Sequence, residues 1–362
     1  MRTRSVLLAT LAALLGVLPG LLPELASAAG AAIPPRRDPH AGVISVPVAF
    51  EVQNVDRSLL PCDADGASYV LRGRLVGPRA DLQRATVDAV TVYVHDFTTG
   101  AWVWQFPDRR HDFVGHLALD GQVSLVIDRL GYGDSDHVDG TGTCLGAQAD
   151  MVHQVVQQLR TGDYLAPGAT PRAGKVVVAG HSVGGAIAEL EAASFDDVDG
   201  LVLMSWSDAG ASARAVQEAS EQTQVCLNGG DPRAGRPAYA YFGQSLRDFR
   251  ELLFHSAARG VQRRAAALRS ADPCGDVESL GPLVTGDNLI SRSVDVPVLL
   301  LFGADDPLNR PDAADLQQHA YAPGTDVTTH VLPDTGSALP LEQSAPRTRR
   351  LLTSWNCRTV GC

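Results

Sequence analysis

One serine stands in a motif that could make it a nucleophile. Residues 175–185 read Lys-Val-Val-Val-Ala-Gly-His-Ser-Val-Gly-Gly, so a strand-like apolar run leads into G-x-S-x-G around Ser182 and then into a helix-like pattern. A sharp strand-to-helix turn strains the backbone at the serine, and Gly180 and Gly184 let neighbouring backbone approach closely. The turn also presents Ser182 Oγ at a helix N-terminus, where N–H groups favour a developing anion.

The surrounding motifs follow the order of a known family. The chain resembles the α/β-hydrolase superfamily over nearly all of its length after residue 28. Residues 93–97 (Tyr-Val-His-Asp-Phe) are similar to the family's oxyanion loop, usually His-Gly followed by an apolar residue. The resemblance implies that the N–H groups of Phe97 and Val183 stabilise the oxyanion of a tetrahedral intermediate. Asp96 stands where glycine is usual, and its carboxylate would oppose that charge unless it points away.

The same resemblance selects an acid. Residues 298–302 are followed by Gly-Ala-Asp-Asp-Pro, and the family's carboxylate stands three residues after the glycine, which selects Asp306 rather than Asp305. Such a carboxylate holds an imidazole in its working tautomer and stabilises the imidazolium. Alternatively, Asp306 only forms a turn before Pro307, and Asp208 is a second position at which some members place the acid.

Ser337 occupies the position at which the resemblance places the base. Residues 332–339 (Leu-Pro-Asp-Thr-Gly-Ser-Ala-Leu) are similar to the family's closing loop, except that Ser337 replaces the catalytic histidine. The histidines that could substitute are His330, His181, His137 and His255. The first is expected to pack within the last strand and the second to point away from Ser182, whereas the other two lie in segments that could overhang the pocket.

Aromatic residues follow the oxyanion loop. Trp102 and Trp104, together with His95, are predicted to line the substrate pocket, which favours an apolar ester or lipid-like ligand. The alternative is that the two indole rings only pack a cap onto the sheet.

Short apolar, β-branched runs alternate with helix-length segments along most of the chain. Residues 44–52 and 68–75 favour an antiparallel hairpin. Later strands are expected at residues 90–95, 123–128, 175–180, 201–205, 298–302 and 327–332. Because these strands are apolar throughout and alternate with expected helices, the sequence predicts a mostly parallel sheet flanked by helices. This is the α/β class, and the resemblance specifies the α/β-hydrolase fold.

One stretch interrupts this alternation. Residues 211–283 contain helical patterning but no convincing strand, so we expect a helical cap at residues 208–290 inserted into a core formed by residues 29–207 and 291–362. Cys226 and Cys274 both lie in the insertion and are expected to be bridged there.

The N-terminus has the features of a secretory signal. Arg2 and Arg4 precede an apolar run and a small-residue site at residues 26–28, so residues 1–28 are predicted to be a signal peptide and the protein to be secreted. No later stretch is expected to span a membrane. The six cysteines all follow residue 28 and predict three structural disulfides. By elimination, the two remaining pairs are Cys62 with Cys144 and Cys357 with Cys362.

Charge and composition exclude several kinds of partner. The formal net charge is -11, so no attraction to nucleic acid or anionic lipid is expected. The cysteines lack the Cys-x-x-Cys spacing of zinc sites. We therefore expect neither a metal nor a cofactor.

Two functions compete on this sequence. The first is an exported serine hydrolase acting on carboxylic ester or lipid-like bonds through Ser182, impaired because the histidine is missing. Loss of the base in subtilisin, which has a different fold, lowers turnover about a million-fold. The alternative is a non-catalytic binding protein of the same fold for an apolar small molecule. Ser337 fits a natural loss of activity, and equally a deliberate replacement that traps a substrate complex.

Overall fold

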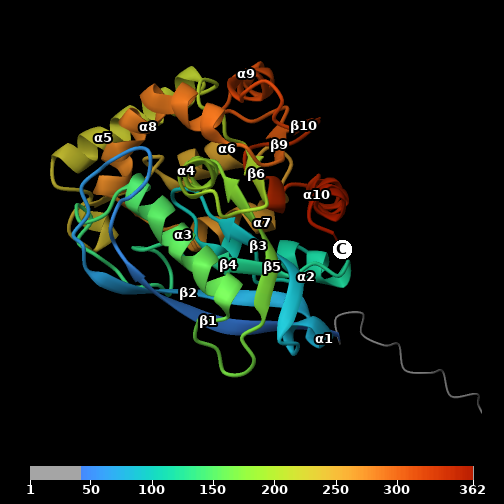
Figure 1. Ribbon diagram of the computed structural model, residues 1–362. Helices are drawn as coiled ribbons and strands as arrows, with labels where there is room; N and C mark the ends of the chain where they lie inside the picture. Colours follow the sequence, from blue (N-terminus) through green and yellow to red (C-terminus); the bar gives the residue numbers. More distant parts are fainter. Residues whose placement is uncertain (1–41, 362) are drawn as a thin grey trace, which may run out of the picture. The chain divides into compact units, whose positions relative to one another are not determined.

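Eight strands form the central sheet of the part of the chain that the computed structural model describes, residues 42–361 (Figure 1). In sheet order they are β1 (Val43–Gln53), β2 (Ser68–Pro78), β4 (Ser124–Ile127), β3 (Thr86–Val94), β5 (Arg172–His181), β6 (Gly200–Met204), β9 (Val298–Gly303) and β10 (Val327–Leu332). β1 and β2 form the predicted antiparallel hairpin, and β2 is also antiparallel to β4. From β4 to β10 all neighbours are parallel, so the predicted fold class is confirmed.

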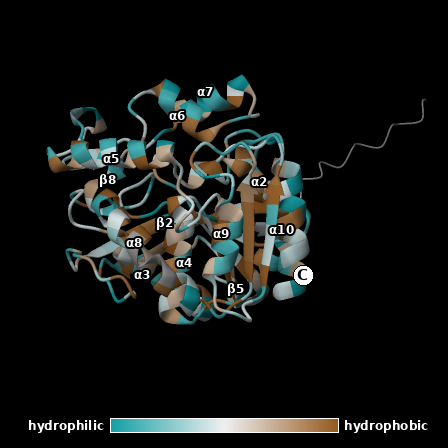
Figure 2. Ribbon diagram, turned by 90° about the horizontal axis from the view of Figure 1, so that it is seen from above, coloured by the Kyte–Doolittle hydropathy of each residue, from teal (hydrophilic) through white to brown (hydrophobic). Residues whose placement is uncertain are grey.

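Helices cover both faces of the sheet, which explains why its strands are apolar throughout. α3 (Leu145–Thr161) and α4 (Val183–Phe195) pack together on one side, and α2 (Phe113–Leu119) and α10 (Ala345–Thr359) pack together on the other (Figure 1). The strands visible in Figure 2 are mostly brown, and the core residues of β5 and β6 are fully buried. The shorter elements of this part are α1 (Arg79–Leu82), η2 (Ala101–Val103), α9 (Ala313–Ala320) and η4 (Leu339–Leu341).

The chain between β6 and β9 is mainly helical, as its patterning suggested. It contains α5 (Ala213–Leu227), η3 (Pro232–Ala234), α6 (Leu246–Leu253), α7 (Arg259–Ala267) and α8 (Cys274–Ser293). No strand was expected here, yet β7 (Tyr239–Ala240) pairs antiparallel with β8 (Asp272–Pro273). Two residues on each strand are too few to show a period. Within residues 42–361, no helix has the length and hydropathy needed to cross a bilayer.

Disulfides fasten this region and the start of α3. The expected Cys226–Cys274 bridge is present and joins the last turn of α5 to the first residue of α8. The expected Cys62–Cys144 bridge joins the loop after β1 to the residue before α3. The predicted signal peptide and Cys362 lie outside the described residues, so pairing of Cys357 with Cys362 stays a prediction.

Removing the Cys226–Cys274 bridge is expected to lower the free energy of unfolding by up to about 4 kcal/mol, because the bridge closes a loop with a sequence separation of 48. Urea unfolding of Cys226→Ala/Cys274→Ala against the wild type measures the loss. Peptide mapping without reduction provides the control. A fragment linking Cys226 or Cys274 to Cys62 or Cys144 would contradict the pairing.

Candidate active site

Ser182 lies at a sharp turn between β5 and α4. Its backbone has φ 49° and ψ -121°, a left-handed conformation that a non-glycine residue adopts only at a cost. A Cβ on Gly180 would lie 2.0 Å from the carbonyl oxygen of Gly184, and one on Gly184 would lie 2.4 Å from the carbonyl oxygen of Val94. Both glycines are therefore required by close backbone contacts. The structure has the strand–turn–helix geometry that the motif predicted for Ser182.

A cavity of about 250 Å³ opens onto Ser182. Its walls come from the loop after β3, from Val183 next to the serine, from the region between β6 and β9, and from the loop after β9. The apolar lining residues are Phe97, Val183, Trp206, Ala211, Ala215, Val216, Ala219, Phe242, Val277, Leu280, Val284 and Leu308. Because small aliphatic side chains of α5 and α8 form much of the wall, the cavity suits a short apolar group.

The aromatic wall expected from Trp102 and Trp104 is not found at this cavity. Trp104 is fully buried and packs its ring 4.9 Å from that of Tyr93, and Trp102 lines a separate hollow beside the β1–β2 hairpin. His95 is also fully buried, and its Nδ1 donates to the Asp96 carbonyl oxygen at 2.8 Å. The aromatic side chains of the cavity are instead Phe97, Trp206 and Phe242. The last two could not be predicted from the sequence, because they meet Ser182 only through contacts between segments distant along the chain.

The Asp96 side chain points into the site. Its Oδ1 accepts the Val183 N–H at 3.1 Å, and the Phe97 N–H and the Ser182 hydroxyl favour its charged form and lower its pKa. The Val183 N–H, one of the two groups predicted to hold a substrate oxyanion, is thus directed at a carboxylate of the chain itself. Asp96 is only 3% exposed, and this burial raises its pKa to about 7 against the opposing effects of those hydrogen bonds and of Arg129.

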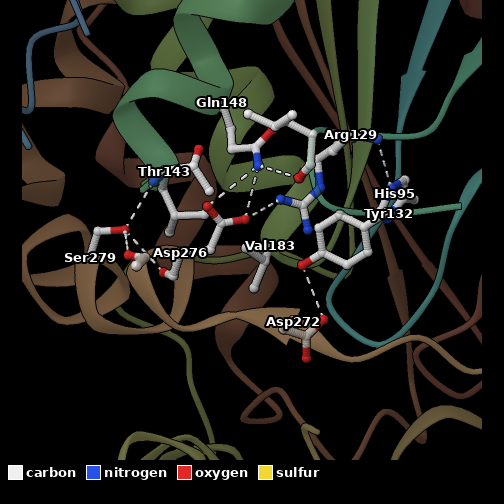
Figure 3. Close-up of polar contacts among 12 residues, drawn as sticks. His95, Arg129, Tyr132, Thr143, Gln148, Val183, Asp272, Asp276 and Ser279 are labelled. Carbon is white, nitrogen blue, oxygen red and sulfur yellow. Dashed lines mark hydrogen bonds and ion pairs between the residues drawn. The ribbon is translucent and has the colours of Figure 1, made fainter. Parts of the chain in front are cut away.

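Arg129 belongs to a buried polar network that ties the oxyanion loop to the start of α8 (Figure 3). Its Nη1 donates to Asp276 at 2.8 Å, and its guanidinium lies 4.3 Å above the ring of Tyr132. The Tyr132 hydroxyl and the Thr98 N–H both donate to Asp272. Because these groups are fully buried and bonded to one another, they fix the loop that carries Asp96.

Ser337 lies in a fully buried group of polar side chains. Its carbonyl oxygen accepts from His181 Nε2 at 2.8 Å and from Ser205 Oγ at 3.1 Å, and its own Oγ lies 3.4 Å from His181 Nε2. Burial lowers the pKa of His181 to about 4, so this imidazole is neutral. His181 thus faces Ser337, as expected for an elbow neighbour that points away from Ser182.

Asp306 joins this group, whereas the two other candidate acids do not. Asp306 accepts from the Leu308 N–H at 2.9 Å and from Asn309 at 2.8 Å. Burial raises its pKa above the usual value, although Asn309, Leu308, Ser205 and the His181 ring act in the opposite direction. Asp305 is 41% exposed and lies 3.9 Å from His255. Asp208 is bound by Trp206 and Ser291 in another network.

None of the histidines considered as a substitute base forms a hydrogen bond with the Ser182 hydroxyl. His330 lies in β10, where burial, Arg347 and Arg358 lower its pKa. The ring of His255 is 45% exposed and faces Asp305. Among residues 42–361, no histidine, His137 included, hydrogen-bonds the Ser182 hydroxyl. Among the described residues, Ser182 therefore lies at the turn with no imidazole hydrogen-bonded to its hydroxyl.

Apart from Asp56 with Cys62 and Cys144, whose sulfur atoms form a disulfide, two clusters of the described residues could hold a metal ion. They are His153 with Glu191 and Asp197, and His255 with Asp305 and Asp334. Neither contributes to the cavity wall, so neither takes part in the site at Ser182.

Comparisons with known proteins agree with this geometry. The model of the alpha/beta hydrolase family matches residues 91–349. An esterase of Thermogutta terrifontis superposes with a TM-score of 0.60 at 18% identity, covering 86% of this chain and 99% of its own. An esterase of Exiguobacterium antarcticum gives 0.58 at 17% identity, with 84% and 99% covered. A monoacylglycerol lipase of Paleococcus ferrophilus gives 0.53 at 18%, with 74% and 93% covered. No curated protein matches the sequence.

Ser337→His is expected to raise hydrolysis of a short-chain aryl ester at least about a hundred-fold, the low end for a positioned base. Imidazole at this position could take the Ser182 proton at neutral pH while Asp306 fixes its tautomer. Spectrophotometric rates for the variant and the wild type test this, and the gain should disappear when Ser182→Ala is added. If the wild type is already efficient and the variant gains nothing, a different residue is the base.

Proposed function

Because the chain belongs to the alpha/beta hydrolase family, we propose that it is an exported serine hydrolase of esterase type that attacks carboxylic esters with Ser182. The two disulfides support export, since such bridges persist in oxidising compartments. Similar structures described as esterases and a lipase support the reaction type.

The strained backbone at Ser182 is the observation that carries this proposal. A non-glycine residue at φ 49° costs on the order of 1–3 kcal/mol, and such strain persists where the surrounding structure enforces it, often at functional sites. Here the strain places Ser182 at the N-terminus of α4 and at the wall of an apolar cavity. A serine with only a packing role would need neither feature.

The cavity supports a substrate class. About 250 Å³ with a mainly aliphatic wall accommodates the acyl or alkyl part of a small, uncharged ester. Ser182 Oγ attacks the ester carbonyl, an acyl-enzyme forms, and water releases the acid. In this reaction the carbonyl oxygen would take the N–H of Val183 at the start of α4, where the helix dipole favours the developing negative charge.

A second function is favoured by one specific contact. The Asp96 carboxylate accepts the Val183 N–H, and Ser337 leaves the site without an imidazole. Both features would suit a protein that binds an apolar small molecule in the cavity and does not turn it over. A binding function alone would give the strained backbone at Ser182 no role.

Labelling with a fluorophosphonate probe separates the two functions. The wild type is expected to be labelled at neutral pH, because the probe reacts with an activated serine. Ser182→Ala should abolish labelling, whereas Ser194→Ala, at the other end of α4 and outside the cavity, should retain it. A folded wild type that stays unlabelled over hours would favour the binding protein.

A further inference from the structure

We infer that Ser182 and Asp96 form a proton-transfer pair, in which the Asp96 carboxylate is the base that replaces the missing histidine. This inference rests on the proposed function, because it assigns a base to ester hydrolysis by Ser182. It also unites the two positions at which the chain departs from its family's pattern, Asp96 and Ser337.

The contacts of Asp96 carry the inference. Its carboxylate accepts the N–H of Val183 at 3.1 Å, the Ser182 hydroxyl lowers its pKa, and all three residues line the same cavity. No other carboxylate lines that cavity. A base must lie within hydrogen-bond reach of the proton that it removes. Asp96 accepts the N–H of the residue that follows Ser182 and faces the same cavity, so its carboxylate is the one positioned to take the Ser182 proton.

The surroundings of Asp96 suit it to this task at neutral pH. Burial raises its pKa to about 7, close to the ideal for a general base. Arg129, at the end of β4, is the charged group that lowers the pKa. The neighbouring His95 ring is neutral, because burial and Arg129 hold its pKa well below the usual value. From α5 and α8 the cavity receives no ionisable side chain among those lining it.

Asp96 and Ser182 account for every proton that moves in the reaction. Asp96 Oδ takes the hydroxyl proton as Ser182 Oγ bonds to the ester carbon, and the carbonyl π electrons move onto oxygen. When the tetrahedral intermediate collapses, the C–O bond to the alcohol breaks and the Asp96 carboxylic acid returns its proton to the leaving oxygen. Water then attacks the acyl-enzyme, giving its proton to Asp96, which passes it to Ser182 Oγ as the acid departs.

The same proton transfer removes the repulsion between the Asp96 carboxylate and the oxyanion of the intermediate. The substrate carbonyl oxygen takes the Val183 N–H once the Asp96 carboxylate turns toward the proton of Ser182. Because Asp96 is neutral after taking that proton, it no longer repels the oxyanion that forms beside it. Uncharged esters with a good leaving group, such as aryl esters, are the class that this site accepts, since the carboxylate repels an anionic substrate before the reaction begins.

The pH profile of aryl acetate hydrolysis tests the pair. Because Asp96 is a base only when deprotonated, kcat/KM of the wild type is expected to rise with pH to a plateau, with a midpoint of about 7. Asp96→Asn should lower kcat/KM at least about 100-fold and remove this rise. Glu191→Gln is the matched control, because Glu191 is another fully buried carboxyl whose pKa is raised by burial, and it does not line the cavity. That variant should keep the midpoint.

Two further variants show what a loss in Asp96→Asn means. Ser337→His in the Asp96→Asn background should restore hydrolysis and Ser182 labelling, which demonstrates an intact fold. Asp96→Gly, which introduces the family's usual residue, should also lose activity, and a gain would show that the carboxylate merely obstructs the oxyanion site. If Asp96→Asn keeps the wild-type rate and pH profile, the inference about Asp96 is wrong and the proposed function still stands. If Ser182 is unreactive in the wild type and in both Ser337→His backgrounds, the proposed function fails as well.

Discussion

The turn at Ser182 is the constraint on which the site depends. β5 must end and α4 begin within one residue, so Gly180 and Gly184 approach each other and the neighbouring strand too closely for any Cβ. This geometry directs the Val183 N–H and the positive end of the α4 dipole into the cavity. Everything else at the site is arranged around that fixed point. The β-sheet supplies the turn, and the helices between β6 and β9 supply the wall that faces it.

Two substitutions change the chemistry available at this turn without changing the turn. The backbone carbonyl oxygen of Ser337 accepts hydrogen bonds from His181 and Ser205, and these bonds hold the closing loop in place. Asp96 brings a carboxylate to the N–H of Val183, where burial keeps it half-protonated near neutral pH. A charge that would inhibit an ordinary esterase becomes, in our account, the group that moves the proton. The buried Arg129 network holds the loop that carries it.

The fold and the turn could be predicted because both depend on local patterns. Apolar runs located the eight strands of the sheet to within a few residues, and the spacing of glycines around Ser182 required a sharp turn. The cavity wall could not be predicted, because the packing of α5 and α8 on the core depends on contacts distant in sequence. For the same reason, the prediction that Trp102 and Trp104 line this cavity was wrong. The direction of the Asp96 side chain also depends on tertiary burial, which no spacing encodes.

Difference infrared spectroscopy between the wild type and Asp96→Asn tests the central claim most directly, because it follows the Asp96 carboxyl itself. We predict a carboxyl that titrates near pH 7 and whose deprotonation coincides with the pH midpoint for phosphonylation of Ser182. A carboxyl that titrates near the ordinary aspartate value of about 4, or a phosphonylation rate that does not follow its titration, would contradict the account.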